Sequence, residues 1–175
     1  KSFTEKKNMV IFRGKVKGKP SRKLFMEMYF SHPMCDLGDV SQNTKDPVEW
    51  RTEKKTINEH LDYKFIMALE GIDVASNLKW IMSSNSIAVM PRPTCETWFM
   101  EGTLIPNYHY IEIKPDFSDL EGRLNYYIEH VDKSLEIIKH AHEFVEQFKD
   151  KKRENLISLL VLDKYFRVTG QKERN

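Results

Sequence analysis

Two stretches of the sequence place polar side chains directly after a buried apolar run. Residues 8–12 (NMVIF) are a short, mainly apolar run that leads into Arg13 and Gly14, and residues 63–69 (YKFIMAL) are a nearly unbroken apolar run that leads into a polar turn beginning at Glu70. In an open parallel sheet, ligands bind beyond the carboxyl ends of the strands, where backbone N–H groups at a helix start can hold an anion. The sequence therefore predicts an anion-binding crevice at these strand ends, suited to phosphate.

The candidate anion ligands are arginines and the short polar residues that follow the second run. Guanidinium groups bind phosphate through paired hydrogen bonds, and a helix N-terminus adds partial positive charge. Arg22 lies at an expected helix start, where it opposes the helix dipole unless an anion is present. The diphosphate ligands that we predict are Arg13, Gly14, Arg22, Asp73, Ser76, Asn77 and Lys79. In a simpler interpretation, Asp73 only caps a helix and Lys79 is exposed to solvent.

A strand, a helix and a second strand are expected to position these residues. Residues 63–69 have the length of a strand that is buried on both faces, and Gly71 permits a sharp turn. Asp73 is a good N-cap for a helix of about three turns. Residues 87–90 form a second apolar strand that ends at Pro91. This order predicts a right-handed crossover in a parallel sheet.

The remaining pattern predicts further elements on both sides of this unit. We expect strands at residues 8–12, 34–37 and 108–113, and helices at residues 22–31, 52–61, 120–130, 132–149 and 154–166. Strands that alternate with helices are typical of an α/β protein, here a Rossmann-like three-layer domain. The last residues, 171–175, are expected to fray.

The irregular segment 91–107 is too aromatic for an ordinary surface loop. It leaves one expected strand end and enters the next strand, so its side chains must pass over the crevice or lie buried beside it. Glu96 and Glu101 are candidates to bond ribose or sugar hydroxyls, and Tyr63 and Trp98 are candidates to face a nucleotide base. Packing of both aromatic rings in the core is the alternative.

Length and composition restrict the class of protein. The 175 residues, 40% of them apolar, suffice for one domain with a core or for one half of a two-domain protein. No run approaches the ~20 apolar residues of a membrane span. Cys35 and Cys95 indicate neither a zinc site nor a disulfide framework, and a reducing compartment fits best. His142 lies on an apolar helical stripe and is predicted to be a packed core histidine.

Positive charge is concentrated near the start of the sequence. The formal net charge is only +2, but the first 23 residues contain nine Lys or Arg and one acidic residue, Glu5. One alternative function is therefore a nucleic-acid binding module that uses the basic loop 15–23. The loop lacks interleaved aromatic residues, which favours a solvated loop instead.

An ordered set of motifs resembles glycosyltransferase family 90. The motifs are FRG (12–14), the later Arg22, LDYKFIMALEGIDVASNLKW (61–80), SSNSIAVMPRP (83–93), ETWFMEGTLIPNYHYIEIK (96–114) and SDLEGRLNYY (118–127). The resemblance covers residues 12–148 and is closest to the bacterial lipopolysaccharide core branch. The family also includes fungal capsule xylosyltransferases and Rumi-type protein O-glucosyltransferases.

This resemblance implies a GT-B architecture of two Rossmann-like domains. Residues 1–150 resemble the C-terminal domain, which holds the nucleotide-sugar donor, and residues 151–175 would add a C-terminal helix and tail. The family's inverting mechanism takes its carboxylate base from the N-terminal domain, so the catalytic residues are not expected in this chain. Where a related branch has a second arginine, this sequence has Asn77, so Lys79, Arg92 or backbone donors are the alternatives.

The resemblance also implies substrates and a location. It implies transfer of a hexose from a nucleotide sugar, with UDP as the expected nucleotide, to a lipopolysaccharide or lipooligosaccharide core, without a metal or other cofactor. The implied partners are the chain's own N-terminal acceptor domain and the cytoplasmic face of a bacterial inner membrane. The terminal helix could contact that membrane or pack across an interdomain cleft. A non-catalytic nucleotide-binding domain is the remaining alternative.

Overall fold

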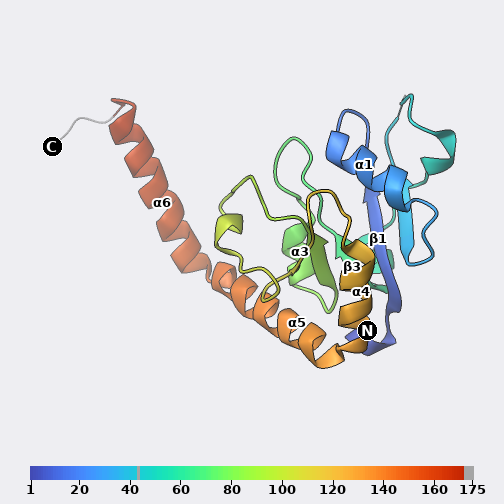
Figure 1. Cartoon of the computed structure of the whole chain (residues 1–175). Helices are drawn as coiled ribbons and strands as arrows, with labels where there is room; N and C mark the ends of the chain where they lie inside the picture. Colours follow the sequence, from blue (N-terminus) through green and yellow to red (C-terminus); the bar gives the residue numbers. More distant parts are fainter. Residues whose placement is uncertain (43, 172–175) are drawn as a thin grey trace.

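The fold is built on a parallel five-stranded sheet (Figure 1). The computed structural model describes residues 1–42 and 44–171. The strands are β1 (Lys7–Gly14), β2 (Cys35–Asp39), β3 (Tyr63–Met67), β4 (Ile87–Met90) and β5 (Ile111–Glu112). Their order across the sheet is β2-β1-β3-β4-β5, and each neighbouring pair is parallel. All carboxyl ends therefore lie at the same edge of the sheet.

Helices cover both faces of the sheet. One face packs against α1 (Pro20–Tyr29) and α4 (Leu120–Glu129), and the other against α3 (Leu78–Met82) and the C-terminal half of α5 (Val131–Glu146). Every residue of β3 and β4 is buried, which explains why these strands have no polar alternation. The predicted three-layer, Rossmann-like α/β fold with C-terminal helices is confirmed.

The remaining elements are short, apart from the last helix. They are η1 (Phe3–Glu5), η2 (Val48–Trp50), α2 (Ile57–His60), η3 (Glu101–Thr103), η4 (Gln147–Lys149) and α6 (Lys151–Val168). The partly buried His142 on α5 contacts the Ser84 carbonyl oxygen through Nε2 at 2.9 Å. Because a carbonyl can only accept, this nitrogen carries a proton, and His142 is packed against the chain but is not a core residue as predicted, since it is only partly buried.

The helix after β3 is shorter than predicted, and Asp73 does not cap it. Helix α3 has five residues and its N-cap is Asn77, whereas the exposed Asp73 carboxylate accepts, among the described residues, only from the adjacent Val74 N–H, at 2.8 Å. The Asn77 amide donates to the Met67 carbonyl at 2.9 Å, which holds the incoming chain against the strand end. The β-branched side chains of Ile72 and Val74 also disfavour a helix in this segment.

Two other elements are shorter than the sequence predicts. The helix expected at residues 52–61 is reduced to α2, because Thr56 and Glu59 form a capping box that starts it late. The strand expected at residues 108–113 is reduced to β5. Asn107 precedes it with a φ of 58°, a left-handed conformation that interrupts an extended chain.

Helix α6 confirms the predicted apolar helix at residues 154–166, and it is joined to the preceding η4 through the Arg153 guanidinium, which donates to the Gln147 carbonyl oxygen at 2.9 Å. None of its residues is buried, and Figure 1 shows it leading away from the sheet. Its exposed apolar side chains are Leu156, Ile157, Leu159, Leu160, Val161, Leu162, Tyr165, Phe166 and Val168. The run 159–162 points to all sides of the helix, because successive residues are rotated by about 100°. The tail 172–175, predicted to fray, lies outside the described residues.

Within residues 1–42 and 44–171, no helix is both long enough and apolar enough to cross a bilayer.

We expect that a chain ending at Asp150 folds as the full chain does, because α6 has no buried residue. Its free energy of unfolding, measured by urea denaturation, should stay within about 1 kcal/mol of the full-length value. As a control, Leu124→Ala empties a core position that is 1% exposed and should cost about 2–5 kcal/mol. Loss of cooperative unfolding on truncation would contradict the division at residue 150.

Candidate functional site

The sheet order creates a crevice between β1 and β3. From β1 the chain crosses through α1 to β2, and from β3 it crosses through α3 to β4 on the opposite face. The connections after β1 and β3 therefore diverge, which in open α/β sheets marks the ligand site. A cavity of about 310 Å³ lies here, which we call the switch-point cavity. It brings together five of the predicted diphosphate ligands, Arg13, Gly14, Arg22, Ser76 and Asn77.

Arg13 lies at the carboxyl end of β1 and is anchored before any ligand binds. Its side chain is 7% exposed and is paired with the carboxylate of Asp36 on β2. One terminal nitrogen also donates to the carbonyl oxygens of Phe12, at 2.9 Å, and Asp36, at 2.8 Å. Its Nε is buried and has no hydrogen-bond partner among the described residues. An unpaired buried donor at a cavity wall is costly unless a ligand accepts from it.

Tyr63 supports this arginine and does not itself line the switch-point cavity. Its hydroxyl donates to the other carboxylate oxygen of Asp36. Burial alone would raise the pKa of Asp36, but the hydrogen bonds from Tyr63 and Arg13 hold it below its usual value. Burial, together with the Asp36 charge, raises the pKa of Tyr63 to about 12. Tyr63, Asp36 and Arg13 thus form one partly buried hydrogen-bonded chain.

Arg22 bridges the two diverging connections. Its guanidinium donates to the carbonyl oxygens of Leu69, at 2.6 Å, and Glu70, at 3.0 Å, and to that of Lys15, also at 3.0 Å. The side chain passes between two glycines, since a Cβ on Gly14 or Gly71 would lie 3.3 or 3.1 Å from its terminal nitrogens. Burial lowers the pKa of Arg22. The bridge leaves some of its five N–H groups for a ligand.

Of the other predicted diphosphate ligands, some line the switch-point cavity and others do not. Ser76 is exposed and lines the cavity together with Asn77 at the start of α3. Asp73 and Lys79 do not line it. The Lys79 ammonium lies 3.3 Å from the buried Glu101 carboxylate and 5.3 Å from the centre of the Trp98 ring. Lys79 therefore fixes the 97–101 segment to α3.

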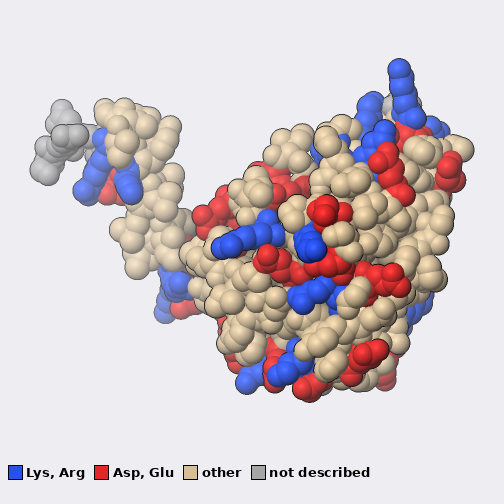
Figure 2. All heavy atoms as spheres, in the orientation of Figure 1, with Lys and Arg blue, Asp and Glu red and all other residues tan. Residues whose placement is uncertain are grey.

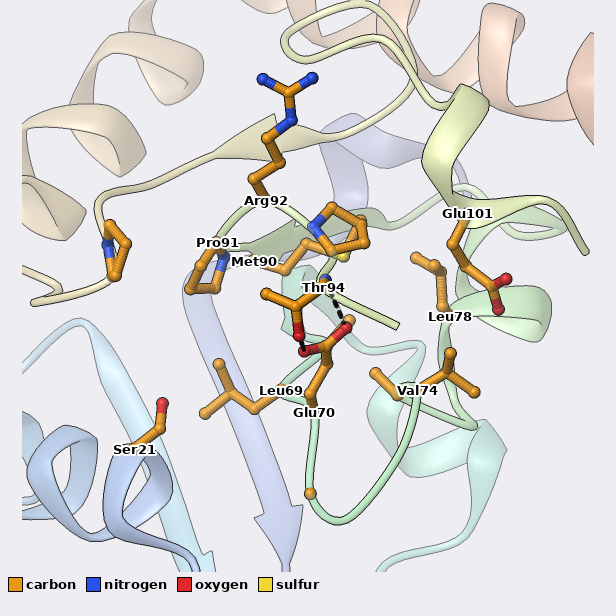
Figure 3. Close-up of a pocket in the computed structure, with 15 residues that line it drawn as sticks. Ser21, Leu69, Glu70, Val74, Leu78, Met90, Pro91, Arg92, Thr94 and Glu101 are labelled. Atoms are coloured by element: carbon orange, nitrogen blue, oxygen red, sulfur yellow. Dashed lines mark hydrogen bonds between the residues drawn. The ribbon is translucent and has the colours of Figure 1, made fainter. Parts of the chain in front are cut away.

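A second cavity, the β3–β4 cavity, adjoins the first (Figure 3). It has a volume of about 300 Å³ and lies between the carboxyl ends of β3 and β4, and Leu69 lines both cavities. Its wall is largely apolar, with Val74, Leu78 and Met90 among its residues. Figure 3 shows the Arg92 side chain on its rim, pointing away from the cavity.

Two glutamates contribute carboxylates to the wall of the β3–β4 cavity. Glu70 accepts from the Thr94 N–H at 2.9 Å and hydroxyl at 2.5 Å, and from the Cys95 N–H at 3.1 Å. Glu101 is 1% exposed and accepts from the Thr97 N–H at 2.7 Å. Burial alone would raise the pKa of Glu101, but hydrogen bonds from Thr97 and Lys79 lower it. Both carboxylates hold the 91–101 segment in place.

Glu96 and Trp98 lie outside both cavities. Glu96 is exposed, with its carboxylate against Gly102. Trp98 is 64% exposed and packs edge-on against Phe99 and Phe148, so core packing does not describe it. The buried ring of this segment is Phe99, which is 1% exposed.

Sequence reasoning missed two basic residues of the switch-point cavity, Lys55 and His60. Both come from the segment before β3, which reaches the cavity because β3 lies beside β1. His60 Nδ1 lies 2.8 Å from the Thr56 carbonyl oxygen, so this nitrogen carries the proton. None of the described residues that line the cavity is acidic, and three are Arg or Lys. The arrangement can hold an anion.

Gly14→Ala should test how tightly the bridge is packed. The new Cβ would lie 2.6 Å from the Phe12 ring and 3.3 Å from Arg22, so we expect a loss of about 1–3 kcal/mol in the free energy of unfolding. Gly122→Ala is the matched control, because a Cβ there meets nothing within 4 Å inside helix α4 and should stabilise by about 0.5–1 kcal/mol. Equal effects at both positions would show that the bridge tolerates a Cβ.

The Tyr63–Asp36 bond should make stability depend on alkaline pH. The folded-state pKa of about 12 lies above the ordinary 10, so the folded chain keeps a proton that the unfolded chain releases between these values. This contribution is complete below pH 10 and is lost as the pH rises toward 12, by about 2 kcal/mol. Urea denaturation should show this loss in the parent chain and not in Tyr63→Phe. Parallel pH profiles for the two proteins would refute the assignment.

Comparison with known proteins shows the family of the chain. The sequence model of glycosyl transferase family 90 matches residues 1–167. The chain is also similar to the O-glucosyltransferase LpsA of Dichelobacter nodosus, with 38% identity over 165 residues, which are 94% of this chain and 51% of that protein. The chain thus spans about half the length of this curated relative. On the family match and on this identity, the chain belongs to glycosyl transferase family 90.

Proposed function

We propose that this chain is the donor-binding domain of a GT-B glycosyltransferase that transfers a hexose from a UDP-sugar, with inversion, to a lipopolysaccharide core. The observation that carries the proposal is the cationic cavity at the β1/β3 switch point of a family 90 member. The relative named above is an O-glucosyltransferase, which supports a hexose as the transferred sugar.

The diphosphate of the donor is proposed to occupy the switch-point cavity. As the bond between the sugar carbon and the diphosphate oxygen breaks, negative charge develops on the leaving diphosphate, and fixed donors that need no reorganisation stabilise it best. Arg13 is fixed by Asp36 and Arg22 by three carbonyl oxygens. Ser76 and Asn77 add polar groups at the start of α3. With these cations present, we propose that binding needs neither a metal nor another cofactor.

The nucleoside is proposed to extend into the β3–β4 cavity. The two cavities share Leu69, so one nucleotide can reach both. The apolar wall suits a flat base, and the carboxylates of Glu70 and Glu101 are hydrogen-bond acceptors suited to ribose hydroxyls. The exposed Glu96 remains a candidate to bond sugar hydroxyls. Trp98, predicted to face the base, does not line the cavity proposed for the base, and the Tyr63 hydroxyl is already engaged by Asp36.

The acceptor and the catalytic base are proposed to lie on a further, N-terminal domain. The curated relative is about twice as long as the stretch that this chain matches, which leaves room for such a domain. An enzyme that acts on a lipopolysaccharide core would work at the cytoplasmic face of a bacterial inner membrane, as a peripheral protein. The exposed apolar side chains of α6 are available to contact that membrane or the N-terminal domain.

The nucleic-acid alternative finds little support in the charge distribution. Figure 2 shows Lys and Arg mixed with Asp and Glu over the visible face. Within the basic loop 15–23, the Arg22 guanidinium bonds backbone carbonyls, and Lys23 lies 3.6 Å from the Asp46 carboxylate. A nucleic-acid surface needs a continuous basic patch.

Calorimetric titration with UDP, UDP-glucose and UDP-galactose, each with magnesium and with EDTA, tests the proposal. We expect binding that does not need magnesium and that Arg22→Gln weakens by about 1.5–3 kcal/mol, through loss of charged hydrogen bonds. Arg123→Gln is the control, because this arginine bonds Asn107 and the Glu112 carbonyl outside both cavities.

Circular dichroism must first show that Arg22→Gln is folded, since Arg22 also holds backbone. Parent-level affinity in folded Arg22→Gln would contradict the site, and absence of nucleotide binding by the parent chain would contradict the function proposed for it. Nucleotide binding without transfer, in a protein that includes the N-terminal domain, would leave a non-catalytic nucleotide-binding domain.

A further inference from the structure

Lys55 differs from the two arginines of the switch-point cavity in how its donors are used. Arg13 and Arg22 donate most of their N–H groups to carbonyl and carboxylate oxygens. Lys55 also lines the cavity, yet its ammonium has one ion-pair contact in the described part of the chain, 3.9 Å from a Glu59 carboxylate oxygen, besides a longer-range attraction to the Asp36 carboxylate. That distance is too long for a hydrogen bond. All three of its N–H groups are therefore available to a ligand.

Lys55 supplies a large share of the positive charge in the cavity that no carboxylate balances. The charge of Arg13 is balanced by the carboxylate with which it pairs, that of Asp36. Arg22 and Lys55 then supply the remaining positive charge among the described lining residues. A nucleoside diphosphate carries more than one negative charge at neutral pH, so Arg22 by itself leaves it incompletely neutralised.

The contact that holds Lys55 away from a ligand is weak. The Lys55 side chain is 31% exposed and that of Glu59 is 51% exposed. Glu59 already uses its other oxygen to accept from the Thr56 N–H, at 2.7 Å, and hydroxyl, at 2.8 Å. Exposed ion pairs of this length contribute little to stability. Lys55 can therefore leave Glu59 without disturbing the capping box of α2.

We propose that Lys55 is a binding residue for the diphosphate in the switch-point cavity and that its ammonium moves from Glu59 to the anion. This inference rests on the proposed function. It also assigns the cation for which Lys79 and Arg92 were the candidates. Lys79 is held by Glu101, and Arg92 points away from the β3–β4 cavity on whose rim it lies (Figure 3).

The test compares Lys55→Met with Lys54→Met in the full chain, by calorimetric titration with UDP, pyrophosphate and uridine. Both changes remove one positive charge, but Lys54 is exposed and does not line the cavity. Lys55→Met should weaken UDP and pyrophosphate binding by about tenfold or more, through loss of charged hydrogen bonds. Lys54→Met should change both by less than about twofold. Lys55→Arg should retain most of the affinity.

Uridine separates anion binding from a structural effect, because it has no phosphate. Its affinity should be the same in all variants, and an equal loss for uridine and UDP in Lys55→Met would overturn the inference. UDP binding by the parent chain with equal affinities for Lys55→Met and Lys54→Met would also overturn it, while leaving the proposed function intact. A parent chain that binds neither UDP nor pyrophosphate would refute the proposed function itself.

Discussion

The hydrogen bonds from Arg22 to backbone carbonyls define the site. Because β1 and β3 send their connections to opposite faces of the sheet, the two chains separate at the edge where a ligand would sit. Arg22 joins them again through the carbonyl oxygens of Lys15, Leu69 and Glu70. The glycines at positions 14 and 71 leave the space that the guanidinium occupies. The wall shared by the two cavities, at Leu69, is held by this bridge.

Much of the fold and part of the site follow from sequence pattern. Apolar runs without alternation identified β3 and β4, and the rule that ligands bind at strand carboxyl ends placed Arg13 and Asn77 near the same crevice. Lys55 could not be placed in this way. Its position depends on β3 pairing with β1 and not with β2, a choice that long-range packing makes and local periodicity does not encode.

Residue type alone also did not distinguish the side chains that can bind a ligand from those that hold the site in place. Tyr63, Asp73 and Lys79 all lie within a motif shared with a sugar transferase family, yet Tyr63 bonds Asp36 and Lys79 bonds Glu101. Buried charges need compensating partners, and which partner is nearest depends on the three-dimensional arrangement. A sequence motif can therefore contain residues that hold a site in place as well as residues that bind its ligand. The division between the two became visible only from hydrogen bonds and burial.

Helix α6 affects how the chain behaves during synthesis. Its apolar side chains are exposed on all sides, and an exposed apolar surface promotes association between unfinished or isolated chains. In chain order, however, α6 follows every strand and every other helix of the described fold. Because translation proceeds from the N-terminus, the sheet can fold before α6 leaves the ribosome. The order of elements thus limits the time for which this surface is presented next to an unfolded core.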